Sequence, residues 1–180
     1  MTILIYGDEH DTSLVEVLLK TLPKYGGVQF FSKNSLICNS LTNSKPKFLV
    51  YELDKLPTSI ECSGLFIFKK SFKKLTPDLF PNNFLPIVDE NNSNAINFLK
   101  KTNKIVITCG TSAKNTISFS SFSHTDAIVV LQRYLQTKNK TIEPHEFSLK
   151  LLSKREPSIL LTICTILLLS DVPSAHGYEI

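Results

Sequence analysis

Residues that could bind a phosphate gather directly after the first apolar run of the chain. The run 3–6 ends at Gly7, and a polar segment continues to an amphipathic run that begins at Leu14. A strand, a tight turn and a helix N-terminus form the geometry in which backbone amides hold a phosphate. Four residues of this turn are therefore candidate ligand-binding residues: Gly7, Asp8, Thr12 and Ser13.

The charges of this turn argue against a phosphate. A phosphate-binding loop needs small residues and usually a lysine, whereas Asp8, Glu9 and Asp11 would repel an anion at contact distance. With His10 these acids could instead hold Mg²⁺ or Mn²⁺. Adjacent residues rarely converge on one ion, however, and acids beside a helix N-terminus are favourable without any ligand. We predict a structural role for the acids and no metal site.

The ends of two further predicted strands carry candidate ligand-binding residues. Glu52 ends the apolar run 47–52, at the edge where doubly wound sheets bind ligands. Because no lysine is expected across from Glu52, the alternative interpretation is that Glu52 is a solvated loop acid without a ligand. Gly110 and Thr111 follow the run 104–109, and their backbone amides and hydroxyls could bind an anion. We predict ligand binding, and no catalytic residue, at these positions.

A polar cluster in the second half of the chain is a candidate partner surface. It consists of Arg133, Glu143, His145 and Glu146. Alternation along a strand would place Glu143 and His145 on one side, and Arg133 on a neighbouring strand could pair with an acid. The alternative is a surface salt-bridge network without a partner.

Composition limits the class of protein. The chain has 180 residues, 42% of them hydrophobic and 20% charged, with a net charge of +4, which fits one folded domain. The basic residues form no stripe, so no nucleic-acid partner is predicted. The most apolar stretch, 159–169, is too short for the roughly twenty residues of a membrane span, and we expect a cytoplasmic protein whose oligomeric state is unknown.

The cysteines indicate core positions rather than a site. Cys38, Cys62, Cys109 and Cys164 lie far apart without metal-ligand spacing, and reduced thiols are expected. Cys109 and Cys164 lie in apolar runs. No spacing brings a general base to Cys109, so a core thiol is predicted.

The order of elements predicts an α/β protein with a mainly parallel, Rossmann-like three-layer sheet, a C-terminal antiparallel meander and a final buried helix. We expect one domain, 1–180, with a parallel part (1–110), a meander (111–155) and a helix (156–172). Strands are predicted at 3–6, 28–31, 47–52, 64–68, 85–89, 104–110, 116–122, 127–134 and 141–152, and helices at 11–22, 91–101 and 156–170.

The second half of the chain resembles a known family in the order of its elements. Residues 87–92, a helix, residues 105–112, three strands and an apolar helix resemble the central domain of the Mur ligases, ATP-dependent enzymes of peptidoglycan synthesis related to folylpolyglutamate synthetase. The family's N-terminal substrate domain and C-terminal domain have no counterpart here. Bacterial cell-wall biology is implied by analogy alone.

The resemblance also assigns the first loop. Residues 7–13 lie where the family has its phosphate loop, Gly-Thr-x-Gly-Lys-Thr-Thr, and Gly7, Thr12 and Ser13 match it. His10 replaces the second glycine and Asp11 the lysine, while Glu52 matches the magnesium-binding Glu. The resemblance thus implies a ligase-like domain that has lost ATP chemistry, with Mg-ATP as cofactor only if the loop still functions.

Two functions remain open. The first is a non-catalytic binding or regulatory module for a protein partner or small ligand. The alternative is an enzyme, or enzyme subunit, that binds a nucleotide or a phosphorylated, UDP-sugar-like substrate through the altered loop.

Overall fold

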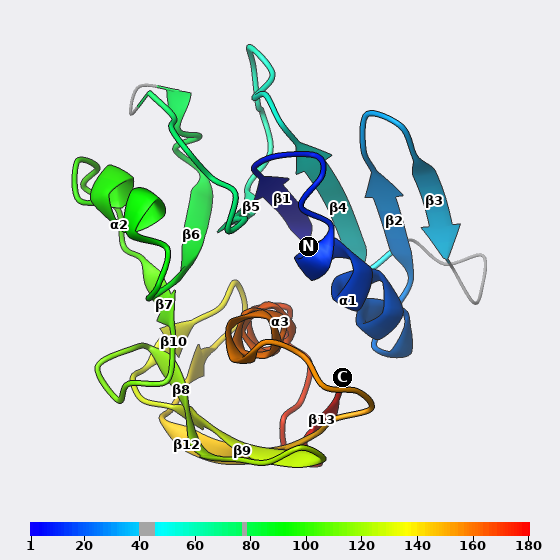
Figure 1. Cartoon of the computed structure of the whole chain (residues 1–180), viewed down its shortest axis with the longest axis vertical. Helices are drawn as coiled ribbons and strands as arrows, with labels where there is room; N and C mark the ends of the chain where they lie inside the picture. The colour runs from blue at the N-terminus through cyan, green and yellow to red at the C-terminus, as the bar shows by residue number, and fades with distance from the viewer. Residues whose placement is uncertain (40–45, 77–78) are drawn as a thin grey trace. The chain divides into compact units, whose positions relative to one another are not determined.

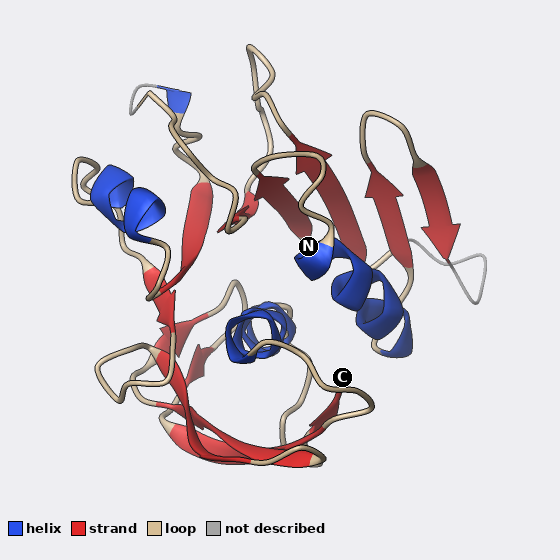
Figure 2. Cartoon of the chain, in the orientation of Figure 1, coloured by secondary structure: helices blue, strands red, loops and turns tan. Residues whose placement is uncertain are grey.

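The computed structural model describes residues 1–39, 46–76 and 79–180 (Figure 1). The chain divides into two compact units. Unit 1 comprises residues 1–88 and 92–106, and unit 2 comprises residues 89–91 and 107–180. Strands dominate both units, and helices follow strands in each, as Figure 2 shows. The predicted α/β class is confirmed.

Unit 1 is built on a mostly parallel sheet. Its strand order is β6-β5-β1-β4-β2-β3, with β1 paired in parallel to both β4 and β5. Only the edge strand β3 is antiparallel to its neighbour in this order. The strands are β1 (Thr2–Tyr6), β2 (Val28–Phe31), β3 (Leu36–Asn39), β4 (Phe48–Leu53), β5 (Gly64–Phe68) and β6 (Phe84–Asp89).

The helices of unit 1 begin and end where the sequence predicts, within a few residues. Helix α1 (Ser13–Thr21) buries Leu14, Val17 and Leu18, which share one helical face. It is followed by the 3-10 turn η1 (Leu22–Lys24). Helix α2 (Ser93–Leu99) is capped by the Asn92 side chain, which accepts a hydrogen bond from the Ala95 amide.

Aromatic side chains form the core of unit 1 on one side of its sheet. Phe66 and Phe68 of β5 pack against Phe72 and Phe80, with ring centroids 4.8–6.3 Å apart. Phe98 of α2 joins them. Such rings contribute large buried apolar areas, so the ends of β1 and β5 are held by a rigid core.

Unit 2 contains the predicted antiparallel meander. Strand β8 pairs antiparallel with β9, and β9 with β12. Strand β7 pairs in parallel with β8. Figure 1 shows α3 beside these curved strands. The elements are β7 (Ile107–Cys109), β8 (Ile117–Phe122), β9 (Asp126–Leu131), β10 (Leu135–Gln136), β11 (Thr141–Ile142), β12 (His145–Lys150), α3 (Pro157–Leu169) and β13 (Tyr178–Glu179).

Some predicted strands are too long. The run 104–110 forms only the short β7, and Ile105 is 81% exposed. The run 141–152 divides into β11 and β12 because Pro144 interrupts it and has no amide to donate. The run 127–134 ends at Leu131. Apolar sequence alone does not show where pairing stops.

The C-terminal tail is also more ordered than its polar sequence suggests. In this tail, β13 pairs with β12 and the Ile180 amide donates to the Lys150 carbonyl. Helix α3 begins at Pro157, where the missing amide costs nothing. Within the described ranges, no helix is long and apolar enough to cross a membrane.

Candidate functional site

The loop after β1 is closed by a lysine from the neighbouring strand end. Lys69 directly follows β5, and its Nζ donates to Glu52 Oε1 at 2.5 Å and to the Asp8 carbonyl at 2.8 Å. The Lys69 side chain is 1% exposed and that of Glu52 13%. A buried ammonium thus lies where a ligand would meet the loop.

The strand order brings these residues together. Because β1 lies between β4 and β5, Tyr6 is opposite Leu53 on one side and Phe68 on the other. The residues that follow these three strands therefore meet at one edge of the sheet. Gly7 is needed there, since a Cβ on it would lie 2.6 Å from the Lys69 Cβ.

The backbone amides of the loop are engaged inside the protein. Those of Gly7 and Asp8 donate to the Leu53 carbonyl at 3.1 Å and to Ser71 Oγ at 3.0 Å. Those of His10 and Asp11 both donate to Asp8, the first to its carboxylate and the second to its carbonyl. A phosphate would have to displace these bonds before it could bind these amides.

Asp11 ties the start of α1 to the loop after β5. Its carboxylate accepts from the Ser71 amide at 3.1 Å and from the Ser13 hydroxyl at 2.8 Å. Burial alone would raise the pKa of Asp11, but the hydrogen bonds from Ser13 and Ser71 outweigh it and lower the pKa. Thr12 donates to Glu16 Oε1 at 2.6 Å. Three candidate residues, Asp8, Thr12 and Ser13, thus form hydrogen bonds inside the protein.

The alternative interpretation of Glu52, a solvated loop acid, is wrong. That interpretation rested on the lack of a lysine across from it, and Lys69 occupies that place. Glu52 lies near Asp8 and Gly7, as the candidate site requires, but its carboxylate is paired inside the protein.

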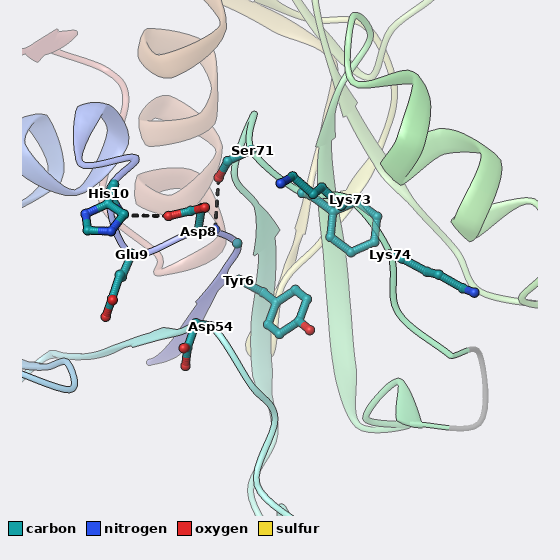
Figure 3. A pocket seen from close by; sticks show the side chains of 10 residues that line it. Tyr6, Asp8, Glu9, His10, Asp54, Ser71, Lys73 and Lys74 are labelled. Atoms are coloured by element: carbon teal, nitrogen blue, oxygen red, sulfur yellow. Dashed lines mark hydrogen bonds between the residues drawn. The ribbon is translucent and has the colours of Figure 1, made fainter.

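A cavity of about 340 Å³ borders the same loop (Figure 3). Asp8, Glu9 and Asp54 carry negative charge along its wall, and Lys73 and Lys74 follow Ser71 with positive charge. The Tyr6 side chain also lines it. Burial, and then the nearby charge of Asp54, raise the pKa of Tyr6.

In the loop after β7, the anion is part of the protein itself. Glu90 Oε1 accepts from the Thr111 amide at 2.6 Å and from the Thr111 hydroxyl at 3.1 Å. Its Oε2 accepts from Asn115 Nδ2 at 2.6 Å. Gly110 makes room, because a Cβ on it would overlap the Glu90 carboxylate. The predicted anion-binding residues Gly110 and Thr111 thus surround an internal carboxylate.

This loop holds Glu90 in its charged form. Burial alone would raise the pKa of Glu90, but the hydrogen bonds from Asn115 and Thr111 outweigh it and lower the pKa. Asn115 is 5% exposed, and its Nδ2 also donates to the Ser112 carbonyl. This buried amide group needs an acceptor, and Glu90 supplies it.

The candidate partner surface of unit 2 is less connected than predicted. Within the part of the chain that the structure describes, Arg133 forms no ion pair with Glu143 or Glu146. Arg133 lies beyond the end of β9, so strand pairing does not bring it to the acids. His145 instead contacts Glu143 O at 2.7 Å and Ser174 Oγ at 2.8 Å.

The thiols of unit 2 are core groups, as predicted. Cys109 and Cys164 are both buried, and Cys109 Sγ lies 3.4 Å from Thr165 Oγ1. Burial raises the pKa of Cys109 to about 12. Among the described residues, no group of three or more His, Cys, Asp or Glu side chains could hold a metal ion.

Four residues of these two loops were not among the sequence candidates: Lys69, Ser71, Glu90 and Asn115. A signal existed for Lys69, since it follows a buried strand directly, as Glu52 lies at the end of another. The strand order that joins the two cannot be read from spacing. Glu90 lies beside an Asn-rich turn, and only the family resemblance drew attention to that turn.

Comparisons with known proteins find similarity to solved structures and to no family model or curated protein. No protein-family model matches the sequence, and no curated protein matches it. Among solved structures, the chain matches a MurF ligase from Thermotoga maritima in complex with ADP, with 12% identity and a TM-score of 0.49. The match covers 93% of this chain and 44% of that one, so this chain spans less than half of that ligase. The bound ADP belongs to that protein.

Proposed function

We propose that this chain is a non-catalytic, Mur-ligase-like binding or regulatory module in which the loop after β1 no longer binds ATP. The sequence resemblance suggests treating 1–180 as one central-domain-like domain with 156–172 as its buried last helix. The observation that carries the loss of ATP chemistry is the closure of the loop by Lys69.

The closure opposes a nucleotide for two reasons. The Lys69 ammonium is already neutralised by Glu52, and withdrawing it would leave a carboxylate that is only 13% exposed without its partner. In addition, the amides of Gly7, Asp8, His10 and Asp11 are all bonded internally. These four amides are therefore not free for a triphosphate, and the nearby acids Asp8, Glu9 and Asp11 would repel it.

Calorimetric titration with Mg-ATP tests this proposal. We expect no saturable heat up to millimolar ATP. Micromolar affinity would overturn the proposal, and Glu52→Ala and Thr12→Ala would then show whether the loop is the site. A Lys101→Ala control removes an exposed lysine that lies after α2, outside the loop.

One observation favours the alternative, an enzyme or subunit that binds a phosphorylated substrate. The cavity of about 340 Å³ beside the loop is of ligand size, and Lys73 and Lys74 line it. Titration with UDP-linked sugars tests this candidate. If a UDP-linked sugar binds and the double variant Lys73→Gln, Lys74→Gln abolishes that binding, the enzyme alternative is favoured. If neither ATP nor a UDP-linked sugar gives heat, the non-catalytic module is favoured.

A further inference from the structure

We infer that residues 110–115 form a binding site for a small oxyanion, a carboxylate or a phosphate, and that Glu90 is its resident internal ligand. An external oxyanion occupies the site when the Glu90 side chain leaves it. This inference deepens the proposed binding function and rests on it, because it names a site and a ligand class for the module.

The donor set has the chemistry of an anion site. The Thr111 amide and hydroxyl face one oxygen of Glu90, and the Asn115 side-chain amide faces the other. A carboxylate that accepts several such bonds is held as an anion, and the lowered pKa of Glu90 agrees with that. Of these donors, Asn115 has a second bond that positions it without Glu90. Asn115 is fixed by its own bond to the Ser112 carbonyl at 3.0 Å.

The site also needs an acceptor whenever Glu90 is absent. Asn115 is 5% exposed, so its Nδ2 cannot turn freely to water if the carboxylate leaves. Thr111, in contrast, is exposed, so the site is open to solvent on that side. A buried donor beside an open face favours an oxyanion from solution as the replacement.

Chemical rescue of a vacated site tests the inference. Glu90→Ala removes the resident carboxylate, and we expect its melting temperature to fall. Sodium acetate or sodium phosphate at tens of millimolar should then raise it by about 2–4 °C more than in the wild type. Sodium chloride of equal ionic strength serves as the salt control, and Glu61→Gln, an exposed acid, as the charge control.

A second variant shows whether the anion enters this site. A Cβ on Gly110 would fill the place of the carboxylate, so Glu90→Ala with Gly110→Ala should not be rescued. In ¹⁵N spectra of Glu90→Ala, acetate and phosphate should shift the Thr111 amide and the Asn115 side-chain amide. A larger shift with one anion would identify the preferred oxyanion.

Three results would overturn the inference: no rescue by either anion, equal rescue of all variants, or shifts confined to other residues. Should Glu90→Ala not fold, Glu90→Ser, which also vacates the site, replaces it in the spectra, with the same expected and contrary results. Failure here is distinguishable from failure of the proposed function, since ATP binding would shift the Gly7 and Asp8 amides instead.

Discussion

The loops after β1 and after β7 begin alike, with a strand that ends at a glycine, but they are closed by opposite charges. At β1 a lysine from the next strand end is bound between Glu52 and the Asp8 carbonyl. At β7 the Glu90 carboxylate is bound by Thr111 and Asn115. A glycine directly after a strand therefore accompanies a bound cation where carboxylate and carbonyl oxygens converge, and a bound anion where amide groups converge.

The difference follows from where the amides of each loop are used. In the first loop, Leu53, Asp8 and Ser71 accept from four of the amides, and the Asp8 carbonyl and the Glu52 carboxylate face Lys69. In the second, the Thr111 amide and the Asn115 side chain both point to one place. Local hydrogen bonds decide which sign of charge a glycine turn can bind, and the presence of the turn alone does not.

The largest expected effect is the loss of stability when Lys69 is removed from the loop after β1. Lys69→Met leaves Glu52 in a place that is 13% exposed without its partner, and we expect a loss of about 3–5 kcal/mol in the free energy of unfolding. Urea unfolding measures it. Lys33→Met, which removes an exposed pair, should cost no more than about 1 kcal/mol.

A double variant sharpens this result. Lys69→Met with Glu52→Gln removes both charges, and its cost should be smaller than that of Lys69→Met alone, because no carboxylate is left unpaired. If Lys69→Met cost no more than Lys33→Met, the ammonium would not hold the loop closed, and the structural basis of the proposed function would be lost.

A smaller loss of stability is expected when the hydrogen bonds of Glu90 in the loop after β7 are removed. Asn115→Ala removes one charge-assisted hydrogen bond and should cost about 1.5–3 kcal/mol, and Glu90→Ala, which removes that bond and the two from Thr111, should cost at least as much. The double variant should cost less than the sum of the two, because they share one bond. Full additivity in urea unfolding would show that Glu90 and Asn115 act separately, and that the loop is not organised around the carboxylate.

Much of the fold could be predicted from the sequence because periodicity and turn residues are local signals. The runs 3–6, 64–68 and 85–89 form parallel strands, and Asn92 caps α2. Where the sequence failed, the cause was not local. Strand 104–110 is short because pairing, and not apolar character, ends a strand, and Ile105 is exposed.

In the candidate site, too, residues with a local sequence signal could be predicted and residues brought in by the strand order could not. Gly7 and Gly110 were found from the sequence because a glycine after a strand is a local signal. Their partners Lys69 and Glu90 were not, since each comes from a different strand end that is distant along the chain. Only the strand order, which no spacing encodes, brings an ammonium to one glycine and a carboxylate to the other.

The smallest expected effect is a difference in acid sensitivity between the two loops. Asp11 and Glu90 both have a pKa below the ordinary values of 3.8 and 4.5. The unfolded chain therefore binds protons at higher pH than the folded one, so their stabilisation is complete above those values and is lost as the pH falls through the lowered pKa of each. Asp11→Asn and Glu90→Gln should each make the acid side of the stability curve less steep.

The loops should nevertheless respond unequally to acid. The bond from Lys69 to the Asp8 carbonyl and that from the Asp8 amide to Ser71 involve no carboxylate, whereas every bond that holds Glu90 to Thr111 and Asn115 ends on one. In ¹⁵N spectra recorded through an acid titration, the Thr111 amide should therefore move with the protonation of Glu90 while the Gly7 amide, which donates to the Leu53 carbonyl, moves less. Equal movement of both amides would mean that the first loop also depends on its carboxylates, and that the opposite charges of the two loops do not separate their stabilities.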